Sequence, residues 1–122
     1  FHIYDNFLTG KTKYLITKKN IINNQFNIYS LLLAASNGDL NSIIILYSKG
    51  IDLNSSDYDK RTALHLACSE GKIEVIKYLI NKNVNKSAID RWDNTPLDDF
   101  KKYLQNIDNV TPIDDEIIKL FT

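Results

Sequence analysis

The chain has 122 residues, 43% of them apolar, which is enough for one domain that buries roughly two-thirds of its unfolded surface. Fifteen basic and fifteen acidic residues give a net charge of zero. No long-range field would therefore attract the chain to nucleic acid or to an anionic membrane. A single cysteine, Cys68, and two histidines exclude an internal disulfide and a zinc-type cluster.

Residues 1–26 begin with Phe-His-Ile-Tyr-Asp-Asn and continue as a polar stretch, which we interpret as a linker segment within a longer protein. Gly10-Lys11-Thr12 is similar to the end of a phosphate-binding loop, but that loop needs an earlier glycine where this chain has Asp5. We expect no cofactor. No apolar run approaches the roughly 18 residues of a bilayer-spanning helix, so we expect no membrane partner.

Residues 27–122 repeat at an offset of about 33, which predicts units at about 24–56, 57–89 and 90–122. Each unit should hold two short antiparallel helices, which can bury their apolar faces only by stacking. The aligned pairs are Leu31 with Leu64, Ala34 with Ala67, Gly38 with Gly71, Ile43 with Ile76, and Leu46 with Leu79.

The second unit is the most regular. Thr62 is predicted to cap its first helix, and Ala67 is small enough to let the paired helix approach closely. Gly71 stands where a left-handed conformation would end that helix. The apolar stripe of the second helix is then supplied by Ile73, Ile76, Leu79 and Ile80.

The outer units are degenerate, as expected for capping repeats. The first has Tyr29-Ser30 where the second has Thr62-Ala63, and in the third Phe100 replaces the small alanine and Leu104 the glycine. An insertion of about nine residues is also predicted in the third unit. It is indicated by Glu116-Ile117-Ile118-Lys119, which matches Glu74-Val75-Ile76-Lys77 at an offset of 42.

The run Thr-Ala-Leu-His-Leu-Ala at residues 62–67 and the period together resemble the ankyrin repeat. The resemblance implies an all-α stack of about three repeats over residues 27–122, the outer ones degenerate and the last carrying the insertion. It also implies a protein as the partner.

The ordered set FHIYDN, DYDKRTALH and DRWDNTP resembles the carboxy-terminal region of the kidney-type and liver-type glutaminases. This resemblance implies a parent enzyme that hydrolyses glutamine to glutamate and ammonia with a Ser-Lys pair on a β-lactamase-like domain before Phe1. The present chain would then be non-catalytic. It also implies an intracellular location, which is the cytoplasm for a bacterial protein or the mitochondrion for an animal-type parent.

Ser69-Glu70-Gly71-Lys72 has the Ser-x-x-Lys spacing of that family's nucleophile, but the chemistry needs both side chains on one helix. Gly71 should end the helix between them, so we assign no catalytic residue. We expect His65 to hydrogen-bond backbone or the neighbouring hairpin and Cys68 to be a packed, inert side chain. We assign no metal ligand, and we expect two acidic pairs to favour helix starts, Asp98-Asp99 and Asp114-Asp115.

The loops between units are the predicted partner-binding site, because Tyr, Trp and Arg are enriched in interface hot spots. The alternative for Trp92 is that it folds back over Phe100 or a neighbouring aliphatic stem. The candidate residues are Tyr58, Asp59, Lys60, Arg61, Arg91, Trp92, Asp93 and Asn94.

Three functions remain for comparison. The first is the carboxy-terminal module of a glutaminase, serving contacts with its own catalytic domain, within a homo-oligomer or with a regulator. The second is an ankyrin module of an unrelated scaffold or of the cytoplasmic tail of a cation channel. The third, an independent enzyme acting on a small-molecule substrate, would need a catalytic pocket that no motif here indicates.

Overall fold

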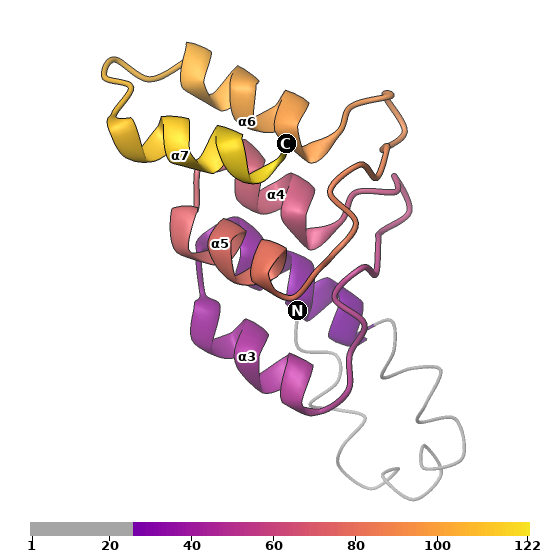
Figure 1. Cartoon of the computed structure of the whole chain (residues 1–122). Helices are drawn as coiled ribbons and strands as arrows, with labels where there is room; N and C mark the ends of the chain where they lie inside the picture. Colours follow the sequence, from indigo (N-terminus) through magenta and orange to yellow (C-terminus); the bar gives the residue numbers. More distant parts are fainter. Residues whose placement is uncertain (1–25) are drawn as a thin grey trace, which may run out of the picture.

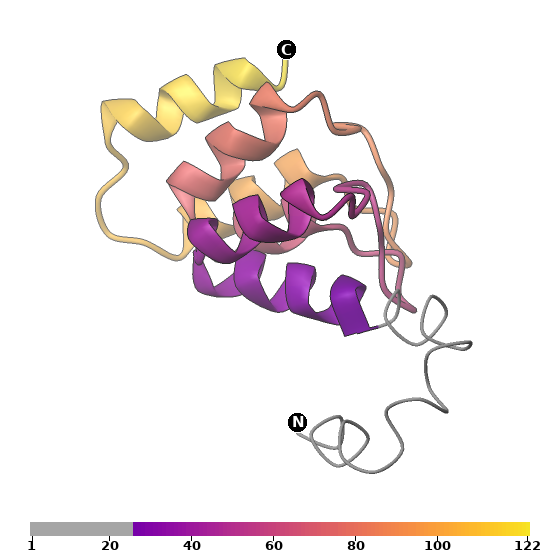
Figure 2. The same cartoon turned by 90° about the horizontal axis from the view of Figure 1, so that it is seen from below.

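The computed structural model describes residues 26–122, which form six helices and no strand. The helices are arranged as three antiparallel pairs stacked on one another (Figure 1), which confirms the all-α ankyrin stack. Viewed from below, the loops that follow α3 and α5 extend to the same side of the stack (Figure 2). The pairs are the helix over residues 26–37 with α3 (Leu40–Ser48), α4 (Ala63–Ser69) with α5 (Ile73–Asn81), and α6 (Pro96–Gln105) with α7 (Pro112–Leu120).

Helix α4 begins and ends where the sequence predicts. The Thr62 hydroxyl accepts a hydrogen bond from the His65 N–H at 3.3 Å, and the His65 ring accepts one from the Thr62 N–H at 3.2 Å. This capping box satisfies amides that a helix start leaves unpaired. Gly71, with φ of 67°, takes the left-handed conformation just after the helix.

The first helix lacks such a start. Tyr29 occupies the position equivalent to Thr62, yet it lies inside a helix that already includes residue 26. Tyrosine has no short side-chain oxygen that could cap the backbone at this point, so the helix is not interrupted there. Gly38, with φ of 76°, ends it as Gly71 ends α4.

The third pair contains the predicted insertion, but it is shorter than the nine residues expected: α6 and α7 begin 16 residues apart and α4 and α5 begin 10 apart, a difference of six. Thr95 caps α6 by accepting from the Asp98 N–H at 3.2 Å, and Pro96 follows at the first turn, where its missing N–H is not needed. Without a glycine stop, α6 runs on to Gln105. Residues 106–111 then connect it to α7, whereas residues 70–72 connect α4 to α5.

One continuous apolar cluster runs through the three pairs. Helix α4 is central to it, because it packs closely against both α5 and α6, and α5 also contacts α7. In the described part of the chain no helix combines the length and the apolar character needed to cross a bilayer. The largest fully buried apolar side chains are Phe100, Leu31, Ile43, Leu64, Ile76, Leu79 and Ile117.

Candidate functional site

Two loop tips carry the eight candidate residues, and an aspartate shapes each tip. The Asp57 carboxylate accepts from the Asp59 N–H at 2.8 Å and the Arg61 N–H at 2.9 Å. Asp90 has the same role in the next repeat, where it accepts from the N–H groups of Trp92 and Asn94 at 2.9 Å each. Each tip is thus closed by a single side chain that satisfies two backbone donors, and both tips have the same shape.

The residue at the apex of each tip has a left-handed backbone. Lys60 has φ of 62° and Asp93 has φ of 63°, a region that residues other than glycine enter rarely. The hydrogen bonds that each tip aspartate accepts hold the backbone in this conformation. Lys60 and Asp93 therefore project their side chains outward at equivalent positions of adjacent repeats.

The structure brings the two tips together. Arg91 donates from its backbone N–H to the Asp59 carbonyl at 2.9 Å, and its guanidinium pairs with the Asp59 carboxylate at 2.9 Å. Arg61 pairs with Asp57 at 3.0 Å and lies 6.0 Å from the centre of the Trp92 ring. The charged groups of the two tips thus largely neutralise one another, and the two tips form a single surface.

Two aromatic side chains stand out on this surface. Tyr58 is 93% exposed, and Trp92 is 56% exposed. With this exposure Trp92 is not a core side chain. The Phe100 ring, over which the alternative would place Trp92, stacks with Tyr103 at 5.8 Å between ring centres. Large exposed aromatic groups on a surface with little net charge are typical of interface anchors.

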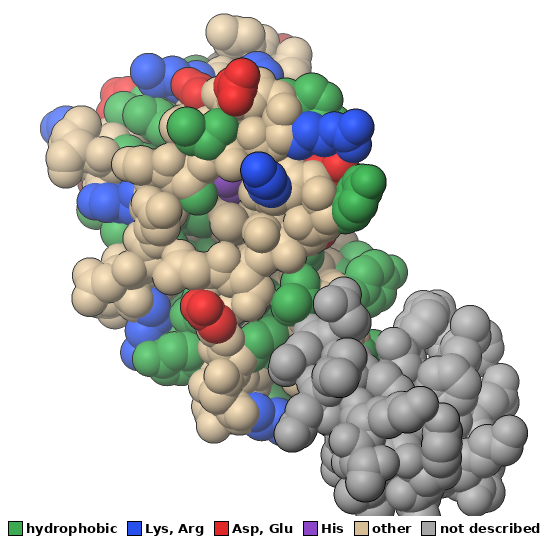
Figure 3. Space-filling view, turned by 90° about the vertical axis from the view of Figure 1, so that its right-hand side faces the viewer, with side chains coloured by type: hydrophobic (Ala, Val, Ile, Leu, Met, Phe, Trp, Pro, Cys, Tyr) green, Lys and Arg blue, Asp and Glu red, His purple; other side chains and the backbone are tan. Residues whose placement is uncertain are grey.

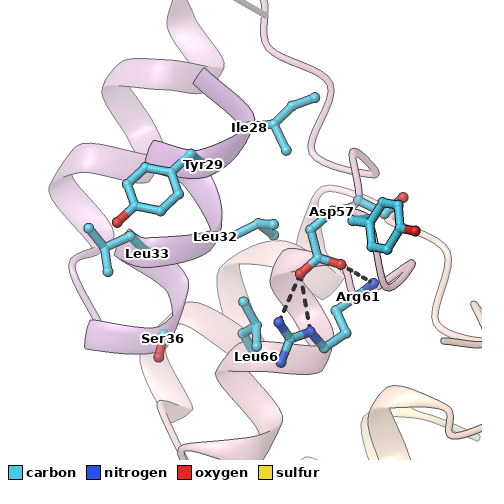
Figure 4. A pocket seen from close by; sticks show the side chains of 10 residues that line it. Ile28, Tyr29, Leu32, Leu33, Ser36, Asp57, Arg61 and Leu66 are labelled. Atoms are coloured by element: carbon cyan, nitrogen blue, oxygen red, sulfur yellow. Dashed lines mark hydrogen bonds and ion pairs between the residues drawn. The ribbon is translucent and has the colours of Figure 1, made fainter. Parts of the chain in front are cut away.

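A groove of about 710 Å³ lies beside the first of these tips. Figure 4 shows Tyr29, Leu32 and Leu33 on the first helix opposite the Asp57–Arg61 ion pair, with Leu66 of α4 below and between them. These groove residues were not predicted from the sequence. Leu33 and Leu66 stand one period apart, and this apolar repetition at a position outside the core pattern is the signal that could have found them.

The face that carries the tips has no dominant charge. Figure 3 views the molecule from that side, and acidic, basic and apolar side chains are mixed over the part of the face that is drawn in colour. A mixed surface of this kind suits a protein partner better than a polyanion, which is bound by clustered basic groups.

A cluster of His65, Asp90 and Asp99 lies behind the tips, with ligand atoms within 4.8 Å of one another. Both ring nitrogens of His65 already have protein partners: Thr62 at Nδ1, and the Asn94 carbonyl oxygen, 2.8 Å from Nε2. A metal ion bound to the ring would have to displace one of these contacts. The cluster therefore links α4 to the next loop, which confirms the predicted structural role of His65.

The neighbouring acid and thiol are shifted by their surroundings. Burial raises the pKa of Asp99, an effect that His65 opposes and Asp90 reinforces. Burial, followed by the nearby Asp99 charge, raises the pKa of the Cys68 thiol far above its usual range. Cys68 is fully buried, and as a neutral thiol it is a poor nucleophile, so the structure confirms the prediction of a packed, inert side chain.

The Ser-x-x-Lys string is split between two helices. Ser69 is the last residue of α4, and Lys72 is the residue that precedes α5. Gly71 turns the chain between them with its left-handed backbone. The two side chains therefore lack the single-helix arrangement in which an amine takes a serine proton.

Comparison with known protein families covers the first two helix pairs and ends at the start of α6. The family description of ankyrin repeats matches residues 5–98 in three copies. The chain is 40% identical over 104 residues to the mitochondrial liver isoform of glutaminase from Mus musculus, which covers 84% of this chain and 17% of that protein. It is 37% identical over 102 residues to putative glutaminase 2 of Caenorhabditis elegans, covering 83% of this chain and 17% of the relative.

A relative of another class matches a shorter stretch. The potassium channel SKOR of Arabidopsis thaliana is 46% identical over 69 residues, which is 57% of this chain and 8% of the channel. The chain thus spans 17% of the length of the two glutaminase relatives. The three matched copies, the stacked helix pairs and the paired loop tips together lead to one conclusion: the chain belongs to the ankyrin-repeat family.

Proposed function

We propose that this chain is a non-catalytic protein-interaction module of a glutaminase and that the loop tips and groove are its docking surface. The similarity to glutaminases supports the parent, because it covers 84% of the chain in the mouse protein whereas the match to the potassium channel covers 57%. The ankyrin repeats are common to both classes of relative. The additional matched residues therefore favour the glutaminase over a channel tail or a scaffold.

The proposal makes the parent, and not this chain, the hydrolase. It is supported by the separation of Ser69 from Lys72 by Gly71 and by the engagement of both His65 ring nitrogens. Two measurements test it. Purified chain should release no glutamate from glutamine, and the gene upstream of Phe1 should encode a Ser-x-x-Lys motif within a β-lactamase-like domain. Transmembrane spans in place of that domain would favour the channel alternative.

The observation that carries the proposed docking surface is the 93% exposure of Tyr58 beside the apolar groove. A tyrosine loses little conformational entropy when it is fixed, so it can anchor a partner at low cost. The ion pairs among Arg61, Arg91 and the tip aspartates hold the platform around it. The proposed contact lies within the oligomer of the parent.

The docking test uses the full-length parent with Tyr58→Ala or Trp92→Ala. Each substitution should weaken self-association by about thirtyfold, which corresponds to a hot-spot loss of about 2 kcal/mol, while the melting temperature of the module stays unchanged. Tyr47→Ala on α3 is the matched control, because Tyr47 is 44% exposed but does not line the groove. Unchanged association in the two tip variants, measured by analytical ultracentrifugation, would remove the tips from the proposal.

The location of the parent belongs to the same proposal. The matched mouse protein is named as mitochondrial, and one buried thiol without a disulfide partner among the described residues suits a reducing compartment. We propose an intracellular location, which fractionation of the cells that express the parent would test.

A further inference from the structure

The first helix pair exposes large aliphatic side chains at positions where the second pair has the half-buried Leu66 and Tyr78. Leu33 on the first helix is 47% exposed, and Ile45 on α3 is 53% exposed. Both lie on helices that also contribute fully buried residues, Leu31 and Ile43. The pair thus has two apolar faces, one of which is packed on the second pair.

Equivalent residues of the second pair show which way Leu33 and Ile45 are directed. Leu66, one period after Leu33, lines the groove together with residues of the first helix, so it is directed toward the preceding repeat. Tyr78, one period after Ile45, shares the Lys82 ammonium with Tyr47 of α3, at 5.5 Å and 5.1 Å from the two ring centres. By the same geometry, Ile45 is directed to the side where a preceding repeat would stack, whereas Leu33, at the position equivalent to Leu66, also lines the groove.

The opposite end of the stack is built differently. His65 and Cys68 of α4 face the third pair and are fully buried. One period later, the same positions in α6 are Asp98 and Lys101, and both are exposed. The first helices of the two end pairs therefore differ at these positions, although α7 of the third pair also exposes Ile113 at 49% and Leu120 at 38%.

Residues of this chain are available to form a further layer on the first pair. The ankyrin match begins at residue 5, well before the first described helix and inside the segment that the sequence alone assigned to a linker. At the repeat offset, residues 7–15 fall in register with α3 and include the apolar Phe7, Leu8, Tyr14 and Leu15, whereas the core positions Ile43 and Leu46 correspond to Gly10 and Lys13. We propose that residues 5–25 pack on Leu33 and Ile45, so that the module is joined to the upstream region of its parent by a packed layer and not by a free tether.

Hydrogen exchange on the full chain tests this directly. Amides within residues 5–25 should be protected in the wild type, and Ile45→Lys should reduce that protection by about tenfold or more while α4 to α7 keep theirs. Ile44→Lys is the matched control: Ile44 is 42% exposed, and its equivalent one period later is the exposed Lys77. This control should leave the segment protected.

Three results would overturn the proposal. They are an unprotected segment in the wild type, equal effects of the two lysine variants on it, and a concentration-dependent dimer that Ile45→Lys dissociates while the segment is unaffected. The last result would show that a second copy covers the face. If Ile45→Lys unfolds the whole chain, the milder variants Ile45→Ala and Leu33→Ala replace it. The protection of residues 5–25 in these variants is then compared with that in the control Ile44→Ala.

Discussion

The second and third helix pairs differ at two equivalent positions: the second has the small residues Ala67 and Gly71, and the third has the large residues Phe100 and Leu104. In the second pair, Ala67 is fully buried and Gly71 ends α4, so α5 packs closely against α4. In the third pair Phe100 takes the place of Ala67 and is also fully buried, and no comparable approach joins α6 to α7. Instead, α6 packs on α4, and α7 contacts α5.

The difference shows what the small residues do. A helix pair can be held by its own close contact only where small side chains let the backbones approach. With a phenylalanine there, the third pair is held mainly by the layer beneath it. Tyr103 of α6 also makes the third pair depend on the second, because its ring lies where a side chain at Gly71 would be.

The largest effect is expected from Phe100→Ala. Removing a fully buried phenylalanine should lower the free energy of unfolding by about 3–5 kcal/mol. If the third pair depends on this ring, α6 and α7 should lose hydrogen-exchange protection before α4 and α5 do. Phe100→Leu, which keeps most of the volume, is the control and should cost less than about 1.5 kcal/mol. Simultaneous loss of all helices at the same denaturant concentration would contradict the comparison.

Gly71→Ala should come next, at about 2–3 kcal/mol, because the left-handed backbone alone costs about 1–2 kcal/mol for a residue with a side chain. A Cβ atom at Gly71 would also lie 2.1 Å from the Tyr103 ring, so the ring must move. Gly38→Ala is the matched control: its φ of 76° is similar, but its Cβ would meet only the flexible stem of Lys72 at 3.0 Å. In denaturant melts, Gly71→Ala should therefore lose more free energy of unfolding than Gly38→Ala, because only the former displaces the Tyr103 ring. In a Tyr103→Ala background the two glycine substitutions should cost the same.

Ala67→Leu tests the close approach in the second pair and should cost about 1–3 kcal/mol by overpacking. The same leucine at Ala88, a half-buried loop position, should have little effect. An unchanged urea midpoint for Ala67→Leu would mean that the second pair tolerates bulk as the third does, and the contrast between them would fail.

The smallest effects on stability are expected at Asp98 and Asp99 of α6, which occupy the positions that His65 and Leu66 have in α4. The hydrogen bond from the Thr95 backbone lowers the pKa of Asp98, whereas burial raises the pKa of Asp99. Ionised Asp98 therefore stabilises the fold above its unfolded pKa, and this contribution is lost as pH falls through its lowered folded pKa. Ionised Asp99 destabilises the fold at neutral pH, and this penalty disappears as pH falls through its raised folded pKa.

Asparagine substitutions should consequently act in opposite directions. At neutral pH, Asp98→Asn should lower the free energy of unfolding and Asp99→Asn should raise it, each by less than about 1 kcal/mol because solvent screens both groups. Both differences should shrink toward acid pH. Thermal melts across the acid range check the signs, and a fall in stability at neutral pH for Asp99→Asn would show that the attraction of His65 and Lys102 outweighs the burial of its charge.

Much of the fold could be predicted because its determinants are local. The caps at Thr62 and Thr95 join residues three apart in the chain, and the left-handed stop at Gly71 depends on one residue. The groove and the cluster of His65 with Asp90 and Asp99 were not predicted, because they combine side chains from separate repeats. Partner docking at the tips and the proposed repeat boundaries remain predictions.

The paired helices, the starts of α4 and α6 and the insertion in the third unit all follow from the amino-acid sequence, because periodicity and capping act over a few neighbouring residues. The pairing of Arg91 with Asp59, the place of Arg61 beside Trp92 and the cover that Tyr103 gives Gly71 follow only from the folded stack. Those contacts join residues about one repeat apart. They depend on the rise and rotation from one layer to the next, which packing sets and no local pattern specifies.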